Sequence, residues 1–265
     1  MPGRSDDTLY AGSAEFYARG RMPYPIAIAN ALRDELGLDG TGRLLDVGCG
    51  PGSLTHLLAP LFAVVVGVDA DADMVRVAAR GGAPNERFVR LRAEELPGGV
   101  GTFDVIIVAQ SLHWFASEEI AGTLHAMLAP AGALVHVGAT THEGDGNVPH
   151  EEITALVKRW LGSEKRAGQG FRTWEGRDPR DVIDVGLFRN RRELEIRRTE
   201  TFERSEDDVV AAVFSLSAAA PHLFGDRVQE FEAELRALLR GRGPFHERPR
   251  DITLTLWEPA PHDGP

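Results

Sequence analysis

Residues 43–69 read RLLDVGCGPGSLTHLLAPLFAVVVGVD, and this stretch decides the fold. The apolar residues Leu44, Leu45 and Val47 predict a short buried strand, which the glycine turn at 48–52 ends. Leucines then recur at helical spacing, and the β-branched run at 64–68 is typical of a parallel strand buried on both faces. The stretch therefore predicts a strand, a helix and a second, parallel strand.

The glycines of the turn, Gly48, Gly50 and Gly52, mark a place where a ligand can approach the backbone closely. In an open parallel sheet, ligands bind beyond the carboxyl ends of the strands, where this turn is expected to lie. Asp69 ends the second strand at the same edge, and a carboxylate there can accept hydrogen bonds from both hydroxyls of a ribose. We therefore expect a cofactor that contains a nucleoside.

The spacing of the glycines distinguishes between cofactors. Dinucleotide sites use G-x-G-x-x-G, whereas this chain has G-x-G-x-G, and Ser53 stands where the third glycine of the dinucleotide pattern is required. This spacing disfavours a nicotinamide cofactor. Asp46, just before the turn, adds a carboxylate that would repel a phosphate but suits an amino group or a sulfonium.

At these residues the chain resembles the class I S-adenosylmethionine-dependent methyltransferases, whose first motif is similar to LLDVGCGPG. The resemblance implies a Rossmann-like, doubly wound α/β fold with a mostly parallel seven-stranded sheet and a helical lid in the C-terminal half. It implies S-adenosylmethionine as the cofactor. It also implies a set of cofactor-binding residues in this stretch, namely Asp46, Gly48, Cys49, Gly50, Gly52 and Asp69.

Two further stretches resemble a subgroup that acts on small molecules and is similar to trans-aconitate methyltransferase. Residues 10–25 are similar to its Y-x-R-x-R-x-x-Y-P pattern, which implies that Tyr17 and Arg21 approach the carboxylate of the cofactor's methionine part. The run AQSLHWF is similar to the subgroup's AQALHWF, which implies that Gln110 lies beside the methionine part and that His113 faces or flanks the substrate pocket. The alternative is that these side chains only pack against the sheet.

The predicted third strand, at 87–91, precedes the sequence AEELP. In the family, this loop meets the adenine ring, and the matching positions are Ala93 and Glu94. Many relatives have an aspartate where this chain has Arg92, so we expect backbone contacts to the adenine here. Strands at 103–109 and 133–137 complete the predicted core, and the polar loop that follows contains His142, a weaker candidate for the pocket.

We expect one domain over 1–265, with a cofactor-binding core at 10–139. Residues 140–251 are expected to form the lid and substrate region, with a sixth strand at 193–202 and a helical pair after it. Ser205 and Asp208 form a near capping box at the start of the first of these helices, and Asp226 is expected to begin the second. The last strand is predicted at 252–257.

The composition of the chain limits the kinds of partner that it is expected to bind. The formal net charge of −11 provides no basic surface for a polyanion, so we expect no nucleic-acid partner. The single cysteine, Cys49, fits a reducing compartment. No signal peptide and no apolar stretch of about 20 residues is visible, so we expect a cytoplasmic protein without a membrane partner.

The expected function is transfer of a methyl group from S-adenosylmethionine to a small-molecule acceptor, preferably at oxygen or carbon, with His113 as the candidate general base. No metal is expected, because metal-dependent relatives place an acid after the fourth strand, where this chain has Ala109 and Gln110. One alternative is a non-catalytic cofactor-binding or scaffold protein. A nicotinamide-dependent oxidoreductase is a less favoured one.

Overall fold

The structure is a computed structural model, which describes residues 9–162, 166–167, 170–171, 178–183 and 186–261. The chain divides into two compact units. We call the described residues of 24–139, 175–196 and 251–265 the sheet unit. Those of 1–23, 140–174 and 197–250 form the helical unit.

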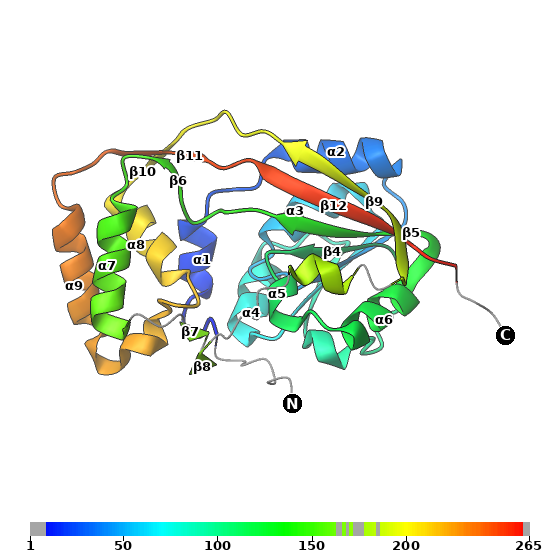
Figure 1. Ribbon diagram of the computed structural model, residues 1–265, viewed down its shortest axis with the longest axis horizontal. Helices are drawn as coiled ribbons and strands as arrows, with labels where there is room; N and C mark the ends of the chain where they lie inside the picture. Colours follow the sequence, from blue (N-terminus) through cyan, green and yellow to red (C-terminus); the bar gives the residue numbers. More distant parts are fainter. Residues whose placement is uncertain (1–8, 163–165, 168–169, 172–177, 184–185, 262–265) are drawn as a thin grey trace. The chain divides into compact units, whose positions relative to one another are not determined.

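Within the described residues, the sheet unit is built on one seven-stranded sheet with the order β3-β2-β1-β4-β5-β12-β9 (Figure 1). The strands are β1 Arg43–Val47, β2 Val64–Asp69, β3 Glu86–Arg90, β4 Phe103–Ala109, β5 Leu128–Gly138, β9 Phe188–Ile196 and β12 Ile252–Pro259. β1 pairs in parallel with β2 and β4, whereas β12 is antiparallel to both of its neighbours. The predicted α/β fold with a mostly parallel seven-stranded sheet is confirmed.

Helices cover both faces of this sheet. They are α2 Ile26–Leu36, α3 Ser53–Leu58, α4 Ala72–Arg80, α5 Leu112–Phe115 and α6 Glu118–Met127, with the 3-10 turns η1 Ala59–Leu61, η2 Ala93–Glu95 and η3 Pro179–Val182. Because successive side chains of a strand point to opposite faces, Ile106 of β4 packs with α5 and α6, while Ile107 packs with α2 and α3. Burying one such side chain contributes about 1.5–3 kcal/mol.

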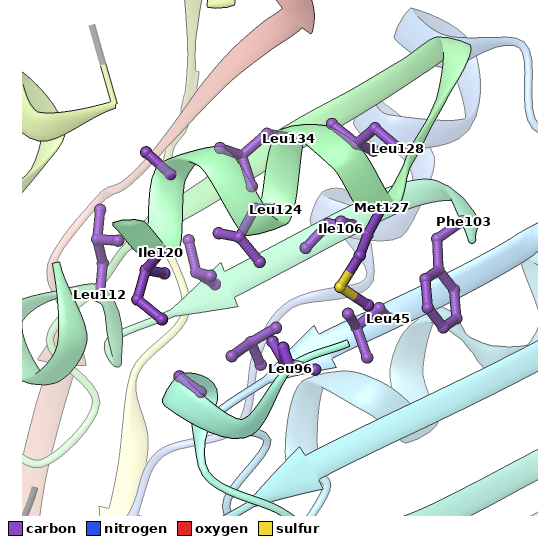
Figure 2. Close-up of a cluster of buried hydrophobic side chains, with 14 of the residues drawn as sticks. Leu45, Leu96, Phe103, Ile106, Leu112, Ile120, Leu124, Met127, Leu128 and Leu134 are labelled. Atoms are coloured by element: carbon purple, nitrogen blue, oxygen red, sulfur yellow. The ribbon is translucent and has the colours of Figure 1, made fainter. Parts of the chain in front are cut away.

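Figure 2 shows the first of these two clusters, in which Ile120, Leu124 and Met127 of α6 lie over Leu45 and Ile106 of the central strands. Leu45 and Ile106 are fully buried and are register partners on neighbouring strands. The β-branched and leucine-rich strands of the sequence are thus buried on both faces, as parallel strands require. This rigid centre holds the carboxyl ends of β1, β2 and β4 at one edge.

The helical unit has its own core. Its elements are α1 Ala14–Gly20, α7 His150–Leu161, α8 Glu206–Phe214, η4 Pro221–Arg227 and α9 Val228–Leu239, the small sheet β10 Phe202–Arg204, β11 Phe245–Pro249 and β6 Gly144–Gly146, and the hairpin β7 Arg166–Ala167 and β8 Gly170–Phe171. The rings of Phe224 and Phe231 stack with centroids 4.0 Å apart, and Phe214 meets both rings edge-on. These aromatic contacts join α8, η4 and α9.

Three predicted boundaries were wrong. The strand expected at 193–202 is β9, Phe188–Ile196, and residues 202–204 belong to β10 in the other unit. β9 is an edge strand whose first half, FRNRR, is charged and held by partners such as Glu258, so only its second half shows the apolar alternation that sequence can reveal. The helix expected to begin at Asp226 begins at Val228, and the strand predicted at 133–137 is β5, which already starts at Leu128.

The expected capping box of α8 is present, because the Ser205 side chain accepts a hydrogen bond from the Asp208 N–H and Asp208 accepts one from the Ser205 N–H. Within the described ranges, every helix is too short or too polar to cross a membrane. Parts of the region 140–251, expected to form the lid and substrate region, lie outside the described residues, namely 163–165, 168–169, 172–177 and 184–185.

Candidate cofactor site

The glycine turn after β1 depends on left-handed backbone. Gly48, Gly50 and Gly52 have φ angles of 73°, 55° and 82°. A Cβ on Gly48 would lie 2.5 Å from the Cβ of Ser111, and one on Gly52 would lie 2.7 Å from Nε2 of His56. Around Gly50, in contrast, nothing lies within 4 Å of an added Cβ. Close packing requires glycine at the two outer positions, whereas the central one faces open space that a ligand can use.

The segment after β4 lies against this turn. The Ser111 hydroxyl donates a 2.6 Å hydrogen bond to the carbonyl oxygen of Val47, the last residue of β1. A Cβ on Gly48 would also lie 3.8 Å from the ring of Phe115. These contacts bring α5, the helix that carries His113, to the glycine turn.

Asp69, at the end of β2, is hydrogen-bonded to the glycine turn. Its Oδ2 accepts a 2.8 Å hydrogen bond from the Gly50 N–H, and its Oδ1 accepts a 2.9 Å bond from the Asp71 N–H. Each oxygen keeps acceptor capacity for one more donor, which is what two ribose hydroxyls require. Burial raises the pKa of Asp69 to about 6, so the side chain is mostly ionised at pH 7.

Asp46, on β1, is a buried carboxylate with one oxygen left unsatisfied. Its Oδ2 accepts a 2.6 Å hydrogen bond from the Thr55 hydroxyl. Its Oδ1 is buried and has no hydrogen-bond partner among the described residues. Burial, aided by the charge of Asp69, raises the pKa of Asp46 to about 7. A cationic ligand group beside the turn would stabilise this charge, whereas a phosphate would not.

The raised pKa of Asp46 predicts an unusual pH dependence of stability. Because the folded chain keeps this proton to a higher pH than the unfolded chain does, the buried charge makes the fold less stable as the pH rises from about 4 to about 7. An Asp46→Asn variant removes this dependence. Its free energy of unfolding, relative to the unmodified chain, should therefore rise by about 2 kcal/mol between pH 5 and pH 8.

Urea denaturation of both chains at the two pH values measures this change. Asp34→Asn is the matched control, because the Asp34 side chain is 71% exposed, and it should show no comparable change. A relative stability of Asp46→Asn that is constant with pH, or that falls, would contradict the assigned burial of this charge.

Gln110, directly after β4, has a strained backbone. Its φ is 54°, in the left-handed region that residues other than glycine rarely adopt. Its Nε2 donates a 2.7 Å hydrogen bond to the hydroxyl oxygen of Tyr24, and its N–H donates to the carbonyl oxygen of Val137. Such strain persists where the surrounding structure holds a residue in place. Here the bonds to Tyr24 and Val137 hold Gln110, whose side-chain amide lies beside the segment that follows β4.

The remaining predicted residues of the sheet unit lie on loops beyond the same strands. The Leu91 N–H donates a 2.9 Å hydrogen bond to the carbonyl oxygen of Asp69, so the chain passes Asp69 before it reaches Ala93 and Glu94 in η2. Ala93 is buried and Glu94 is exposed. His113 is half-buried, and its ring lies 4.7 Å from that of Trp114.

Tyr17 and Arg21 belong to the helical unit. The Arg21 guanidinium lies 4.4 Å from the centre of the Tyr17 ring and donates hydrogen bonds to Ser215, Thr141 and His142. These bonds hold the arginine with neutral groups of its own unit. The approach of Tyr17 and Arg21 to a cofactor carboxylate stays a prediction.

The sequence analysis did not identify several residues that hold the site in place. Thr55 is hydrogen-bonded to Asp46, Tyr24 to Gln110, and Ser111 to Val47 of β1. No local sequence pattern predicts such tertiary hydrogen bonds. Asp71 did carry a signal, because an aspartate before a helix is a common N-cap, and its side chain accepts bonds from the N–H groups of Asp73 and Met74. Among the described residues, no group of three His, Cys, Asp or Glu side chains could hold a metal ion.

Comparisons with known proteins show what the chain is similar to. Residues 44–132 match the family model described as a methyltransferase domain. An uncharacterized methyltransferase-like protein of Schizosaccharomyces pombe is 30% identical over 160 residues, which cover 60% of each chain. Trans-aconitate 2-methyltransferase of Rhodopseudomonas palustris is a more distant relative, 35% identical over 109 residues that cover 40% of this chain and 42% of that enzyme.

A solved structure supports the fold. The YcgJ protein of Bacillus subtilis aligns with a TM-score of 0.51 and 17% identity, covering 88% of this chain and 98% of that one. The chain therefore has the α/β methyltransferase fold. Residues 44–132 are similar to methyltransferase domains. The chain spans less than two thirds of the length of the curated relatives named above. The comparisons support the predicted class of methyltransferases. They do not distinguish the trans-aconitate-like subgroup from other members of this class.

Proposed function

We propose that this chain transfers a methyl group from S-adenosylmethionine to a small-molecule acceptor. The observation that carries the proposal is the pair of carboxylates around the glycine turn. Asp69 has two oxygens oriented by backbone N–H groups, and Asp46 has a buried oxygen without a partner among the described residues. The first suits a ribose and the second suits a cationic amino group or sulfonium, and S-adenosylmethionine contains these groups together.

The residues present fit this cofactor. Asp69 would accept the ribose hydroxyls, the Asp46 side would face the positively charged part, and Gly50 leaves the space that the ligand needs. When bound, the cofactor supplies a methyl group that its sulfonium already activates for in-line displacement. The chain then needs mainly to position the acceptor and, where the acceptor carries a proton, to remove it. His113, on the helix that meets the glycine turn, is the proposed base.

The acceptor is proposed to be a metabolite that is methylated at oxygen or carbon. The runs at 10–25 and 109–115 support a small-molecule substrate through their resemblance to the trans-aconitate-type subgroup. A screen with methyl-labelled S-adenosylmethionine and a metabolite extract tests the function. We expect label in a small molecule, with S-adenosylhomocysteine released in equal amount, and much less of both with Asp69→Ala.

A non-catalytic cofactor-binding protein is the competing function, because a cofactor site alone does not prove turnover. The same screen separates the two. A chain that binds S-adenosylmethionine but releases no S-adenosylhomocysteine with any extract would favour the binding protein. Acceptor-dependent release favours the enzyme.

The acidic charge predicts that nucleic acid is not the substrate. With a formal net charge of −11, the chain should show no sub-micromolar binding to DNA or RNA, even at low salt, where electrostatic attraction is weakly screened. A mobility-shift assay at about 20 mM salt checks this, because the Debye length there is above roughly 20 Å. Tight binding that weakens steeply with added salt would contradict the proposed substrate class.

A further inference from the structure

The helical unit contains a cavity that the cofactor site does not use. Its volume is about 340 Å³, which is within the range of small-molecule pockets of roughly 300–1,000 Å³. All of its lining residues belong to the helical unit. Half of its lining residues are apolar, namely Val148, Ile153 of α7, Val209, Ala212 and Val213 of α8, and Leu216, and the other half are polar or charged.

The charged groups of the lining are already paired. The two oxygens of Glu247 lie 2.6 Å from Nη1 of Arg204 and 2.6 Å from Nε2 of His150. Glu247 is fully buried, and its Oε1 also accepts a hydrogen bond from the Gly144 N–H. Glu143 at the lining is paired with Arg250 at 3.2 Å. The charged lining residues are therefore already matched by one another or by Arg250, which disfavours an ionised ligand among them.

His142, one of the lining residues, can offer a hydrogen-bond donor. An arginine can only donate hydrogen bonds, so the 3.3 Å contact from Nη1 of Arg21 makes Nδ1 of His142 the acceptor. Burial and the charge of Arg21 lower the pKa of His142 to about 3, so the ring is neutral at pH 7. A neutral ring that accepts at Nδ1 carries its proton at Nε2. The nearest carboxylate oxygen to Nε2, on Glu143, is 4.0 Å away, beyond hydrogen-bond distance.

We propose that this cavity binds an uncharged small molecule with an apolar part and a hydrogen-bond-accepting oxygen, which the Nε2–H of His142 contacts. The inference stands on the helical unit alone and does not depend on the proposed methyl transfer. The apolar walls provide the affinity, the paired charges exclude ionised ligands, and the histidine orients the oxygen.

A matched pair of probes and a matched pair of variants test the proposal in the full chain. The probes are methyl cinnamate, an uncharged ester, and cinnamate, its anionic acid. Thr154→Trp places a bulky side chain at the cavity from an exposed position of α7. Ala155→Trp adds the same side chain to the neighbouring exposed residue, which does not line the cavity. Thermal denaturation checks that both variants fold.

Ligand-observed NMR titration should show saturable binding of methyl cinnamate, at least about tenfold tighter than that of cinnamate. Thr154→Trp should weaken ester binding by about tenfold or more, and Ala155→Trp should leave it unchanged. A His142→Phe variant should weaken it about three- to tenfold, the effect of one neutral hydrogen bond. Absence of saturable ester binding, tighter binding of the acid, or equal effects of the two tryptophan variants would overturn the proposal.

Discussion

A His113→Ala variant is expected to lose at least about a hundredfold in kcat while it still binds S-adenosylmethionine. The expectation follows from position and chemistry. α5 lies against the glycine turn through Phe115, and histidine is the side chain best matched to proton transfer near neutral pH. General-base catalysis typically contributes a hundredfold to ten-thousandfold, which sets the size of the expected loss.

The measurement is a steady-state assay of S-adenosylhomocysteine release with an acceptor found by the labelled screen, together with calorimetry for the cofactor. Trp114→Phe is a suitable control, because it alters the ring that contacts His113 without removing the base. A loss of less than about tenfold, with cofactor affinity intact, would show that His113 only lines the site and that proximity supplies the acceleration. Equal losses in kcat and in cofactor affinity would instead make His113 a support of the cofactor loop.

Asp69→Ala should weaken S-adenosylmethionine binding about ten- to a hundredfold. Hydrogen bonds to a charged group contribute about 1.5–3 kcal/mol, which corresponds to this change in affinity. Because Asp69 also accepts the N–H groups of Gly50 and Asp71, its removal loosens the turn as well as the ribose contact. An Asp69→Asn variant keeps an acceptor oxygen. Its affinity for S-adenosylmethionine should therefore lie between those of the unmodified chain and Asp69→Ala.

Calorimetric titration of the folded variants gives these affinities. Asp73→Asn is the control, since its side chain lies on α4 near the site and is about half exposed. We expect that control to bind as tightly as the unmodified chain. Unchanged affinity in Asp69→Ala would remove the central residue of the proposed site.

The core of the fold could be predicted because one continuous stretch contains most of the information. β1, the glycine turn, α3 and β2 are adjacent in the sequence, and each follows from local rules: β-branched runs, helical spacing, and glycine where φ is positive. Asp69 followed from its place at the end of β2. The prediction of β4 at 103–109 matched its observed bounds for the same reason, because a central parallel strand is apolar on both faces.

What the sequence reasoning missed depends on tertiary contacts or on exposed edges. The bond between Tyr24 and Gln110 joins residues far apart in the chain, and the orphaned oxygen of Asp46 becomes visible only once burial is known. The start of β9 was missed because the first half of this edge strand is charged and held by ion pairs, without apolar alternation. The cavity of the helical unit draws its lining from segments as distant as His142 and Glu247, so no local pattern could reveal it.

The most direct test of the account is calorimetric titration of the unmodified chain with S-adenosylmethionine and, separately, with NADH. The account predicts one-site binding of S-adenosylmethionine, with a Kd within the roughly 1 μM to 1 mM range of enzyme substrates, and much weaker or no binding of NADH. Ser53 at the third glycine position and the unsatisfied charge of Asp46 are the reasons for this preference. Tighter binding of NADH, or no binding of S-adenosylmethionine by the folded chain, would contradict it.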